Sequence, residues 1–461
     1  MNLQEFFRFI DVVTLELLFF AGIWFVVALF DELLVDTLWA WLRLRGKGRA
    51  LEFAGEDRAQ LRGLAAIFIP CWQEGGVVGT TLRFATHAWQ QENCRFFVGS
   101  YPNDPDTITA IEAEAARDAR IVPVILPNDG PTTKADCLNH LYRRMSSEET
   151  RLGAFRFVVL QDAEDQVHPS ALALMDDRLE RADFVQLPVI PVFQPGSRWI
   201  SGHYADEFAE NHLKTLVVRD WLRTGFPAAG VGCAFRRKML ADIAALRGEP
   251  VPFAAECLTE DYELGLLVSE LGGTSRFVRA VDADGRLIAT REYFPGRFDA
   301  AVRQKARWIH GIAFQGWDRL GWAKRPAEIW MRMRDRRGPL VAIVLFAAYL
   351  LIVLRAVVYL AQLAGWYERA PVSLVLHTIV LVTLLGLLWR MVTRFVATTA
   401  LYGWVEGFAA IVRLPIANVI TILAARRAFV AYFGSLRGRA IHWDKTEHHA
   451  HPMAEFMAET R

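Results

Sequence analysis

Phe155-Arg156-Phe157-Val158-Val159-Leu160-Gln161-Asp162-Ala163-Glu164-Asp165 is the stretch that decides the fold. Its first six residues form a short, mostly apolar run, which is typical of a strand buried on both faces. Three carboxylates follow within four residues, and they repel one another unless a cation or buried donors compensate. The stretch predicts either a divalent-cation site at the end of a buried strand, or a solvated acidic turn in which Asp165 caps the next helix. By itself it favours neither.

Three similar apolar runs lie upstream, at residues 65–70, 95–99 and 121–126. Apolar-periodic stretches at 77–89 and 107–117 separate them and predict helices. Strands that alternate with helices predict an α/β domain with a mainly parallel sheet, whose ligand site lies at the carboxyl ends of the strands. The polar loops at those ends are therefore the first place to look for chemistry.

The loop at residues 127–139 opens a predicted helix with glycine, proline, hydroxyl side chains and Lys134. Such a loop can hold a nucleotide or diphosphate at the helix N-terminus, although it lacks the GxxxxGK[ST] pattern. The alternative is an ordinary capped turn.

Thr259-Glu260-Asp261 begins another predicted helix. Thr259 can cap this helix and the two acids suit its dipole; alternatively, Asp261 is a general base. The glycine-rich turn at 230–233 allows either the close approach of a substrate or a bulge.

The stretch Arg303-Gln304-Lys305-Ala306-Arg307-Trp308-Ile309-His310-Gly311 stands just before a long apolar segment. A guanidinium binds oxyanions bidentately and an indole offers a flat apolar face, so this helix can meet a phosphate and a sugar ring. Alternatively it is an interfacial helix, anchored at lipid headgroups by its tryptophan and basic residues.

The 461 residues are 53% hydrophobic and 22% charged, so the apolar excess must be concentrated in segments. This pattern predicts an integral membrane protein with a soluble portion. The net charge of +1 argues against a nucleic-acid partner. Five scattered cysteines without a CxxC pair are expected to be reduced thiols in the cytosol.

Three segments are long and apolar enough to cross a bilayer, at 12–34, 339–363 and 371–389. Basic residues after the first segment predict an outer N-terminus and a cytoplasmic α/β domain. Arg355, inside the second segment, is expected to snorkel or to meet a polar pathway. Residues 396–424 contain Glu406, Arg413 and Pro415, which favours an amphipathic interfacial helix over a fourth crossing.

In order along the chain, the motif residues resemble those of the membrane-embedded family 2 glycosyltransferases, relatives of cellulose, chitin and hyaluronan synthases. The matching set is Pro70 with Glu74, Lys134-Ala135-Asp136 with Asn139, Asp162-Ala163-Glu164-Asp165, Thr259-Glu260-Asp261 and Gln304-Lys305-Ala306-Arg307-Trp308. Within that family the chain resembles the bacteriophage adsorption protein B type, on residues 98–107, 291–295, 303–311 and 443–448. Relatives of that type continue into a further domain thought to be regulatory, so this chain is expected to be a short form or a truncated one.

The resemblance implies a GT-A (Rossmann-like) fold at residues 60–330, between a transmembrane helix at 1–45 and transmembrane and interfacial helices at 335–435, with a cytoplasmic tail at 436–461. It also implies a UDP-sugar donor and Mg²⁺ or Mn²⁺ as cofactor. Asp162 and Glu164, with Asp165 close by, would hold the metal, and Glu164 replaces the commoner second aspartate. Asp261, beside Glu260, would be the catalytic base. The implied substrate-binding residues are Pro70, Glu74, Asp104, Lys134, Asp136, Gln304, Arg307 and Trp308.

The implied reaction is inverting transfer of a sugar, such as an N-acetylhexosamine, to a growing exopolysaccharide at the bacterial inner membrane. The implied partners are a UDP-sugar, a polysaccharide acceptor and the lipid bilayer, together with an outer-membrane export partner or an oligomer that completes a channel. Two alternatives stay open: transfer of a single sugar to a polyprenyl phosphate, and an inactive receptor or scaffold.

Overall fold

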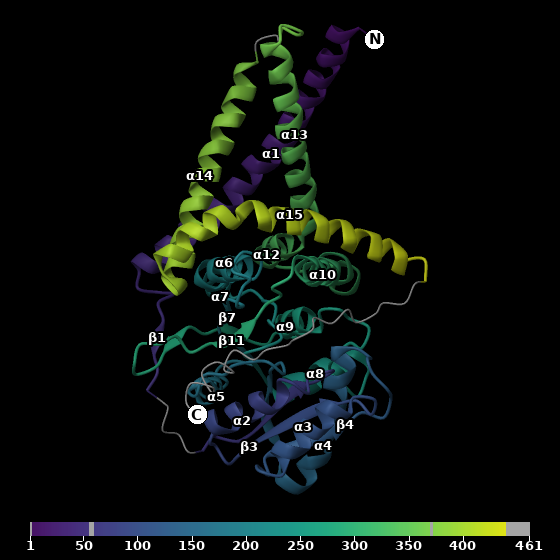
Figure 1. Ribbon diagram of the computed structural model, residues 1–461. Coiled ribbons are helices and arrows are strands. Elements are labelled where there is room, and N and C mark those ends of the chain that lie inside the picture. Colours follow the sequence, from purple (N-terminus) through teal and green to yellow (C-terminus); the bar gives the residue numbers. More distant parts are fainter. Residues whose placement is uncertain (1, 55–59, 369–371, 439–461) are drawn as a thin grey trace.

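The computed structural model describes residues 2–54, 60–368 and 372–438. The long helices α1 (Leu3–Leu44), α13 (Gly338–Leu363) and α14 (Leu374–Tyr402) stand together over an α/β domain, and the long helix α15 (Trp404–Ser435) lies across between the two parts (Figure 1). The stretch 443–448, on which part of the resemblance rests, lies outside the described residues, as does most of the 436–461 tail.

A seven-stranded sheet of order β4-β3-β2-β5-β8-β6-β9 forms the centre of the α/β domain. Strands β2 to β5 run parallel, whereas β8 is antiparallel to both β5 and β6. The four predicted strands are all present, and the mainly parallel α/β sheet is confirmed. The strands are β2 (Leu64–Pro70), β3 (Cys94–Ser100), β4 (Ile121–Ile125), β5 (Phe155–Leu160), β6 (Phe184–Gln186), β8 (Cys233–Arg236) and β9 (Ser275–Phe277).

Both faces of this sheet are buried, because side chains alternate between two cores along each strand. In β2, Ile67 and Ile69 pack with helices α2, α3 and α5, whereas Ala66 and Phe68 pack with α4, α8 and α9. Burial on both faces explains why the strands appear in the sequence as continuous apolar runs. The helices are α2 (Val78–Ala88), α3 (Pro105–Ala115), α4 (Lys134–Leu152), α5 (Ala171–Arg178), α8 (Arg237–Arg247) and α9 (Glu260–Glu270).

A second layer covers the carboxyl edge of the main sheet. Two short parallel pairs belong to it, β7 (Val189–Val192) with β11 (Thr290–Tyr293) and β1 (Leu51–Glu52) with β10 (Ala280–Val281). Helices α6, α10 and α12 lie between this layer and the long transverse helix (Figure 1). The helical segments are α6 (Gly202–Glu210), the π-helical η1 (Asn211–Thr215), α7 (Leu216–Trp221), α10 (Phe298–Ile309), the π-helical η2 (His310–Gln315), α11 (Gly316–Leu320) and α12 (Pro326–Arg336).

Four of the described helices are long and apolar enough to cross a membrane by length and composition: α1 (Leu3–Leu44), α13 (Gly338–Leu363), α14 (Leu374–Tyr402) and α15 (Trp404–Ser435). The first three stand together, and α15 runs across their lower ends (Figure 1). The predicted segment 396–424 has different bounds in the structure, because Gly403, with φ of 86°, ends α14 and starts a new helix. Arg355 of α13 faces Asp11 of α1, with 3.5 Å between the guanidinium and the carboxylate.

A network of charged side chains joins the long helices to the α/β domain. Asp31 and Glu32 of α1 accept hydrogen bonds from Arg337, at 2.7 and 2.6 Å, and both also pair with Arg334. Lys214 of η1 lies 2.6 Å from the carboxylate of Asp36, one turn further along α1. Because each carboxylate meets at least one cation, the burial of these charges is compensated and α1 is fixed to the domain.

Helix α15 is fixed to α6 by a buried arginine. The Arg413 guanidinium donates to both carboxylate oxygens of Asp206, at 2.8 and 2.7 Å, and to Glu406 at 2.7 Å. The side chains of Arg413 and Asp206 are 1% and 0% exposed, so this ion pair is shielded from solvent. Ala424 and Ala428 of α15 pack against Ala306 of α10. The transverse helix thus lies directly on the helix that carries Arg307 and Trp308.

Candidate active site

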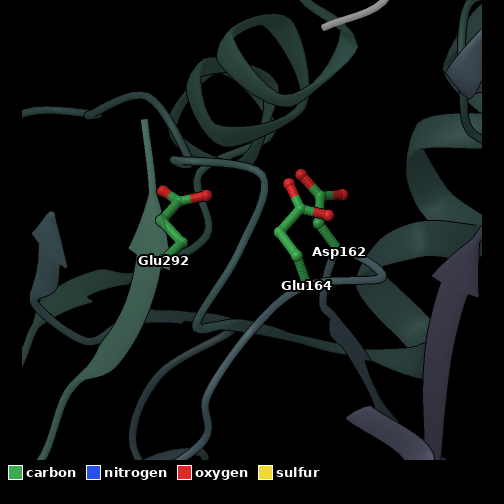
Figure 2. A group of neighbouring side chains, drawn as sticks. All are labelled: Asp162, Glu164 and Glu292. Carbon is green, nitrogen blue, oxygen red and sulfur yellow. The ribbon is translucent and has the colours of Figure 1, made fainter. Parts of the chain in front are cut away.

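Three carboxylates from two parts of the chain converge above the carboxyl end of β5. Asp162 and Glu164 come from the loop after β5, and Glu292 comes from β11 and faces them (Figure 2). Each offers one oxygen, and the three oxygens lie within 4.8 Å of one another. The peptide groups of Gln166 and Arg291 exchange hydrogen bonds of 2.8 and 2.9 Å, which set the acidic loop in register with β11. This bridge fixes the distance between Glu164 and Glu292.

These carboxylates fit a hard divalent cation. Burial raises the pKa of Glu292 well above its usual range, and the charges of Asp162 and Glu164 raise it further, against the opposing effect of Lys134. A group of acids that resists ionisation is stabilised by a cation, and carboxylate oxygens are the ligands that Mg²⁺ and Mn²⁺ prefer. Asp162, Glu164 and Glu292 are therefore the residues that would hold the metal.

Asp165 has a different place. It is fully buried, and its Oδ2 accepts a hydrogen bond of 2.7 Å from the backbone N–H of Asp162. It does not cap the following helix, because α5 begins at Ala171 after Ser170. Its carboxylate shapes the acidic loop from below, and the three-carboxylate group does not include it.

Glu292 is the member of the group that sequence reasoning did not select. The sequence contains a weak indication of its role, because Glu292 is an acid in a short strand between two buried residues, Thr290 and Tyr293. Its position opposite Glu164 depends on the pairing of β11 with β7, which a single sequence does not reveal.

Lys134 links the acidic loop to the predicted base. It is the first residue of α4, and its Nζ lies 2.6 Å from Oδ1 of Asp162. Burial disfavours its ammonium form, but the charges of Asp162, Glu260 and Asp261 outweigh this and raise the pKa of Lys134. A Cβ placed on Gly230 would lie 2.7 Å from Oδ2 of Asp261 and 3.4 Å from the Lys134 Nζ. The glycine turn therefore lets the backbone approach both groups closely.

Glu260 and Asp261 form the first turn of α9. Burial and the charge of Asp261 raise the pKa of Glu260 to about 7, against the effect of Lys134. Burial also raises the pKa of Asp261, while Lys134 and, more weakly, Arg307 lower it. The predicted side-chain cap by Thr259 is wrong, because its Oγ1 is buried and makes no hydrogen bond. Both acids thus have raised pKa values beside the cationic groups of Lys134 and Arg307, a setting suited to a general base.

The predicted donor-side residues gather at the ends of β2 and β3. Pro70 is the buried last residue of β2, and Glu74 follows in the next loop. The backbone N–H of Gln73 donates to Oδ2 of Asp104 at 2.5 Å, so the carboxylate of Asp104 joins the two loops. The Trp72 and Tyr101 rings meet edge to face at 5.2 Å beside them. Aromatic rings and an acid in this position are suited to a nucleoside.

The loop before α4 closes the same region from the side. Asn103 Nδ2 donates to the carbonyl of Gly130 and Asn103 Oδ1 accepts from its N–H, both at 2.8 Å. The side chain of Thr133 caps α4 by accepting from the N–H of Asp136. The Asp136 carboxylate lies 3.8 Å from His140, while Lys134, two residues earlier, contacts Asp162. Of the two predicted residues in this turn, Lys134 is the one placed in contact with the acidic group.

Helix α10 approaches from the opposite side with Gln304, Arg307 and Trp308. Arg307 lies close enough to Asp261 for its charge to lower the pKa of that carboxyl. The indole of Trp308 packs on Tyr204, Phe294 and Phe208, with ring centroids 5.8 to 6.4 Å apart. Oε1 of Gln304 is buried without a hydrogen-bond partner.

This fold is GT-A-like: a central, mostly parallel Rossmann-type sheet with an acidic loop at its carboxyl edge. A solved structure with the same fold is the mannosyltransferase PcManGT from Pyrobaculum calidifontis in complex with GDP-Man and Mn²⁺, with a TM-score of 0.52 and 15% sequence identity over 89% of this chain and 99% of that one. The chain belongs to the glycosyltransferase-like family 2, whose sequence model matches residues 63–311. Within this chain, long apolar helices flank the part that the family model matches.

Two curated relatives match nearly the whole chain. They are bacteriophage adsorption protein B of Escherichia coli K12 and bacteriophage N4 adsorption protein B of Escherichia coli O157:H7, each 34% identical over 448 residues. The match covers 91% of this chain and 60% of each relative, so the chain spans about three fifths of their length.

Proposed function

We propose that this protein transfers a hexosyl group, such as an N-acetylhexosamine, from a UDP-sugar to a growing polysaccharide at the inner membrane. The observation that supports this most is the row of charged groups from Glu292, Glu164 and Asp162 through Lys134 to Asp261 and Glu260. It places the three carboxylates that would hold a metal ion beside the proposed base, Asp261, which Arg307 of α10 also approaches.

In the proposed reaction, the carboxylate of Asp261 takes the proton of an acceptor hydroxyl as that oxygen attacks the anomeric carbon. The bond between this carbon and the phosphate oxygen breaks in the same step, so the configuration inverts. The nucleoside diphosphate leaves with the bonding electrons, and Lys134 and Arg307 stabilise the charge that develops. Mg²⁺ or Mn²⁺ bound by Asp162, Glu164 and Glu292 would supply further stabilisation of the diphosphate.

The proposed membrane arrangement has α1, α13 and α14 crossing the bilayer, with the N-terminus outside and the transferase domain in the cytoplasm. Helix α15 would lie in the headgroup region. Its transverse direction supports this (Figure 1), as do its contacts with α6 and α10 on one face and the exposed apolar residues Trp404, Phe408 and Val412 on another. Three crossings line a narrow path at most, so an oligomer or an outer-membrane export partner would complete the route of the polymer.

The test is incubation of membranes that contain the protein with Mn²⁺ and a panel of UDP-sugars and GDP-mannose, measuring nucleotide release and polymer formation. We expect one UDP-sugar to give both. A lipid-soluble product with a single sugar would indicate a polyprenyl phosphate acceptor. If no donor is consumed, and the Asp261→Asn variant supports the same cellular role as the wild type, the protein is a receptor or scaffold instead.

Replacement of Glu292 by glutamine is expected to weaken Mn²⁺ binding about 10- to 100-fold, because a neutral amide oxygen takes the place of one of three charged ligands. Titration of Mn²⁺ by calorimetry, and the Mn²⁺ dependence of transfer, measure this. Asp165→Asn is the matched control, since its amide oxygen can still accept from the N–H of Asp162. A larger effect at Asp165 than at Glu292 would reverse the assignment.

Transfer is expected to be slower in acid. The base must be deprotonated to act, and burial raises the pKa of Asp261 above the usual value of an aspartate. Below that raised pKa the rate should fall by up to about tenfold per pH unit. Glu260→Gln removes a negative charge beside Asp261, which favours ionisation of Asp261 and should move the acid limb to lower pH. Profiles of kcat/KM against pH measure both, and an unmoved limb in Glu260→Gln would show that the two acids do not titrate together.

A further inference from the structure

The helix that carries Gln304, Arg307 and Trp308 changes its winding where it passes the predicted base. Helix α10 ends at Ile309, and the chain continues without a break as the π-helix η2, from His310 to Gln315. A π-helical turn is uncommon and widens the helix by one residue per turn, and such turns occur often at functional sites. Here the widened turn faces the loop that precedes Glu260 and Asp261.

Gly311 of η2 lies against Thr259 without a gap. A Cβ on Gly311 would come within 2.4 Å of Thr259 Oγ1 and 2.6 Å of its Cγ2. Thr259 is 5% exposed, and it is the residue directly before Glu260. Any side chain at position 311 must therefore displace the side chain of Thr259, the residue that leads into the two acids.

The side chain of Gln315, one turn further along, holds the same loop through two hydrogen bonds. Its Oε1 accepts from the backbone N–H of Leu258 at 3.1 Å, and its Nε2 donates to the carbonyl of Glu256 at 3.4 Å. Gly316 follows, and a Cβ there would meet the ring of Tyr262 at 3.1 Å. Contacts from Gly311 and Gln315 of η2 and from Gly316, the first residue of α11, thus reach both sides of Glu260–Asp261.

The opposite face of η2 packs on the transverse helix. The rings of Phe314 and Tyr432 stack with centroids 4.8 Å apart, and the Tyr432 hydroxyl donates to Asp318 at 2.9 Å. Helix η2 therefore lies between α15 and the loop at residues 256–262.

We propose that η2 is a clamp in which Gly311 and Gln315 act as positioning residues for Asp261, so that the acceptor-side helix and the catalytic base move as one unit. This proposal rests on the proposed role of Asp261. The clamp keeps the distance between the base and a hydroxyl held by α10 constant when α10 shifts. Because a misplacement of about 1 Å can cost about 100-fold in rate, a rigid connection between these elements has a direct catalytic effect.

The first test compares Gln315→Ala, Gln315→Glu and Asp318→Asn. Gln315→Ala is expected to lower kcat about 10- to 100-fold with an unchanged KM for the donor and unchanged binding of UDP with Mn²⁺. Gln315→Glu keeps the acceptor for the Leu258 N–H but loses the donor to the Glu256 carbonyl, so it should lose less kcat than Gln315→Ala without matching the wild type. Asp318→Asn is the matched control, since it lies just beyond η2 and contacts Tyr432 rather than the base loop. The clamp proposal would be wrong if Gln315→Ala had the kcat of the wild type, or if its affinity for UDP fell by the same factor as its kcat.

The second test is a double-mutant cycle between positions 311 and 259. Gly311→Ala should lower kcat by a similar factor, and Thr259→Ala in the same chain should restore part of it, because it removes the two atoms closest to the new methyl group. Additive losses in the double variant would contradict the contact.

Hydrogen–deuterium exchange provides a readout that does not need turnover. In Gln315→Ala the amides of residues 257–262 should exchange faster, while those of β5 stay protected. If no sugar is transferred by any variant, the proposed function fails, whereas the exchange result still decides on the clamp. Unchanged exchange at 257–262 would overturn it.

Discussion

Asp261→Asn should nearly abolish sugar transfer, lowering it by about 10²- to 10⁴-fold, while UDP and Mn²⁺ still bind. An amide has no basic oxygen to take the proton of the acceptor hydroxyl, and general-base catalysis alone accounts for about 10²- to 10⁴-fold. Binding of UDP with Mn²⁺ should be retained because the carboxylates that would hold the metal, those of Asp162, Glu164 and Glu292, lie on other segments of the chain. The measurements are nucleotide release with the best donor and calorimetric titration of UDP with Mn²⁺.

The neighbouring Glu260→Gln variant is the control for this experiment. It removes an acid from the same helical turn but leaves the proposed base in place, so it should retain measurable transfer with an altered pH profile. The roles would be exchanged if Glu260→Gln were inactive and Asp261→Asn active. Loss of nucleotide binding in Asp261→Asn would show a binding role for Asp261 instead.

Arg413→Ala should destabilise the protein by about 3–5 kcal/mol. The substitution leaves the carboxylate of Asp206, which is 0% exposed, without the guanidinium that accompanies it inside the protein. An unpaired buried charge is the costly outcome of breaking such a pair, whereas a surface pair would matter little. Because Asp206 and Arg413 join α6 to α15, the apparent melting temperature in detergent should fall and transfer should decrease with it.

Arg426→Ala is the matched control, since Arg426 lies on the same helix with an exposed side chain. It should change the melting temperature little. The double variant Asp206→Asn/Arg413→Ala removes both charges and should recover part of the loss, because the amide is less costly to bury than a carboxylate. Equal destabilisation by Arg413→Ala and Arg426→Ala would show that the buried pair does not hold α15.

The parallel part of the sheet could be predicted because its strands are short apolar runs with helices between them. Ile67 and Phe68 point to opposite cores, and both are fully buried, so the apolar run in the sequence was continuous. The short length of that run indicated a strand. Strand β8 was not predicted. It is four residues long, and its antiparallel place between β5 and β6 depends on pairing partners distant in sequence.

The residues of the candidate site also differ in whether local sequence or long-range strand pairing determines their position. Asp162, Glu164, Lys134 and Asp261 follow directly from strand ends or helix starts, so their proximity could be expected from local sequence and the sheet rule. The position of Glu292 could not be predicted, because within the described part of the chain β11 pairs with β7 alone and reaches the acidic loop through one bridge, at Gln166. Asp165 was expected close to the metal by adjacency, and it lies near enough to Glu292, Asp162 and Glu164 for their charges to raise its pKa, but its Oδ2 accepts from the N–H of Asp162 and it is not one of the three converging carboxylates.

The bridge between Gln166 and Arg291 has a consequence for the order of assembly. It joins segments far apart in the chain, so a large loop must close before the acidic loop and β11 meet, and such contacts tend to form late. During synthesis, β2 to β5 can pair while the C-terminal part of the domain is still missing. A chain that has emerged only as far as β9 has the fold's central strands but lacks Glu292. The carboxylate group is therefore completed among the last parts of the domain, just before the α13 segment is made.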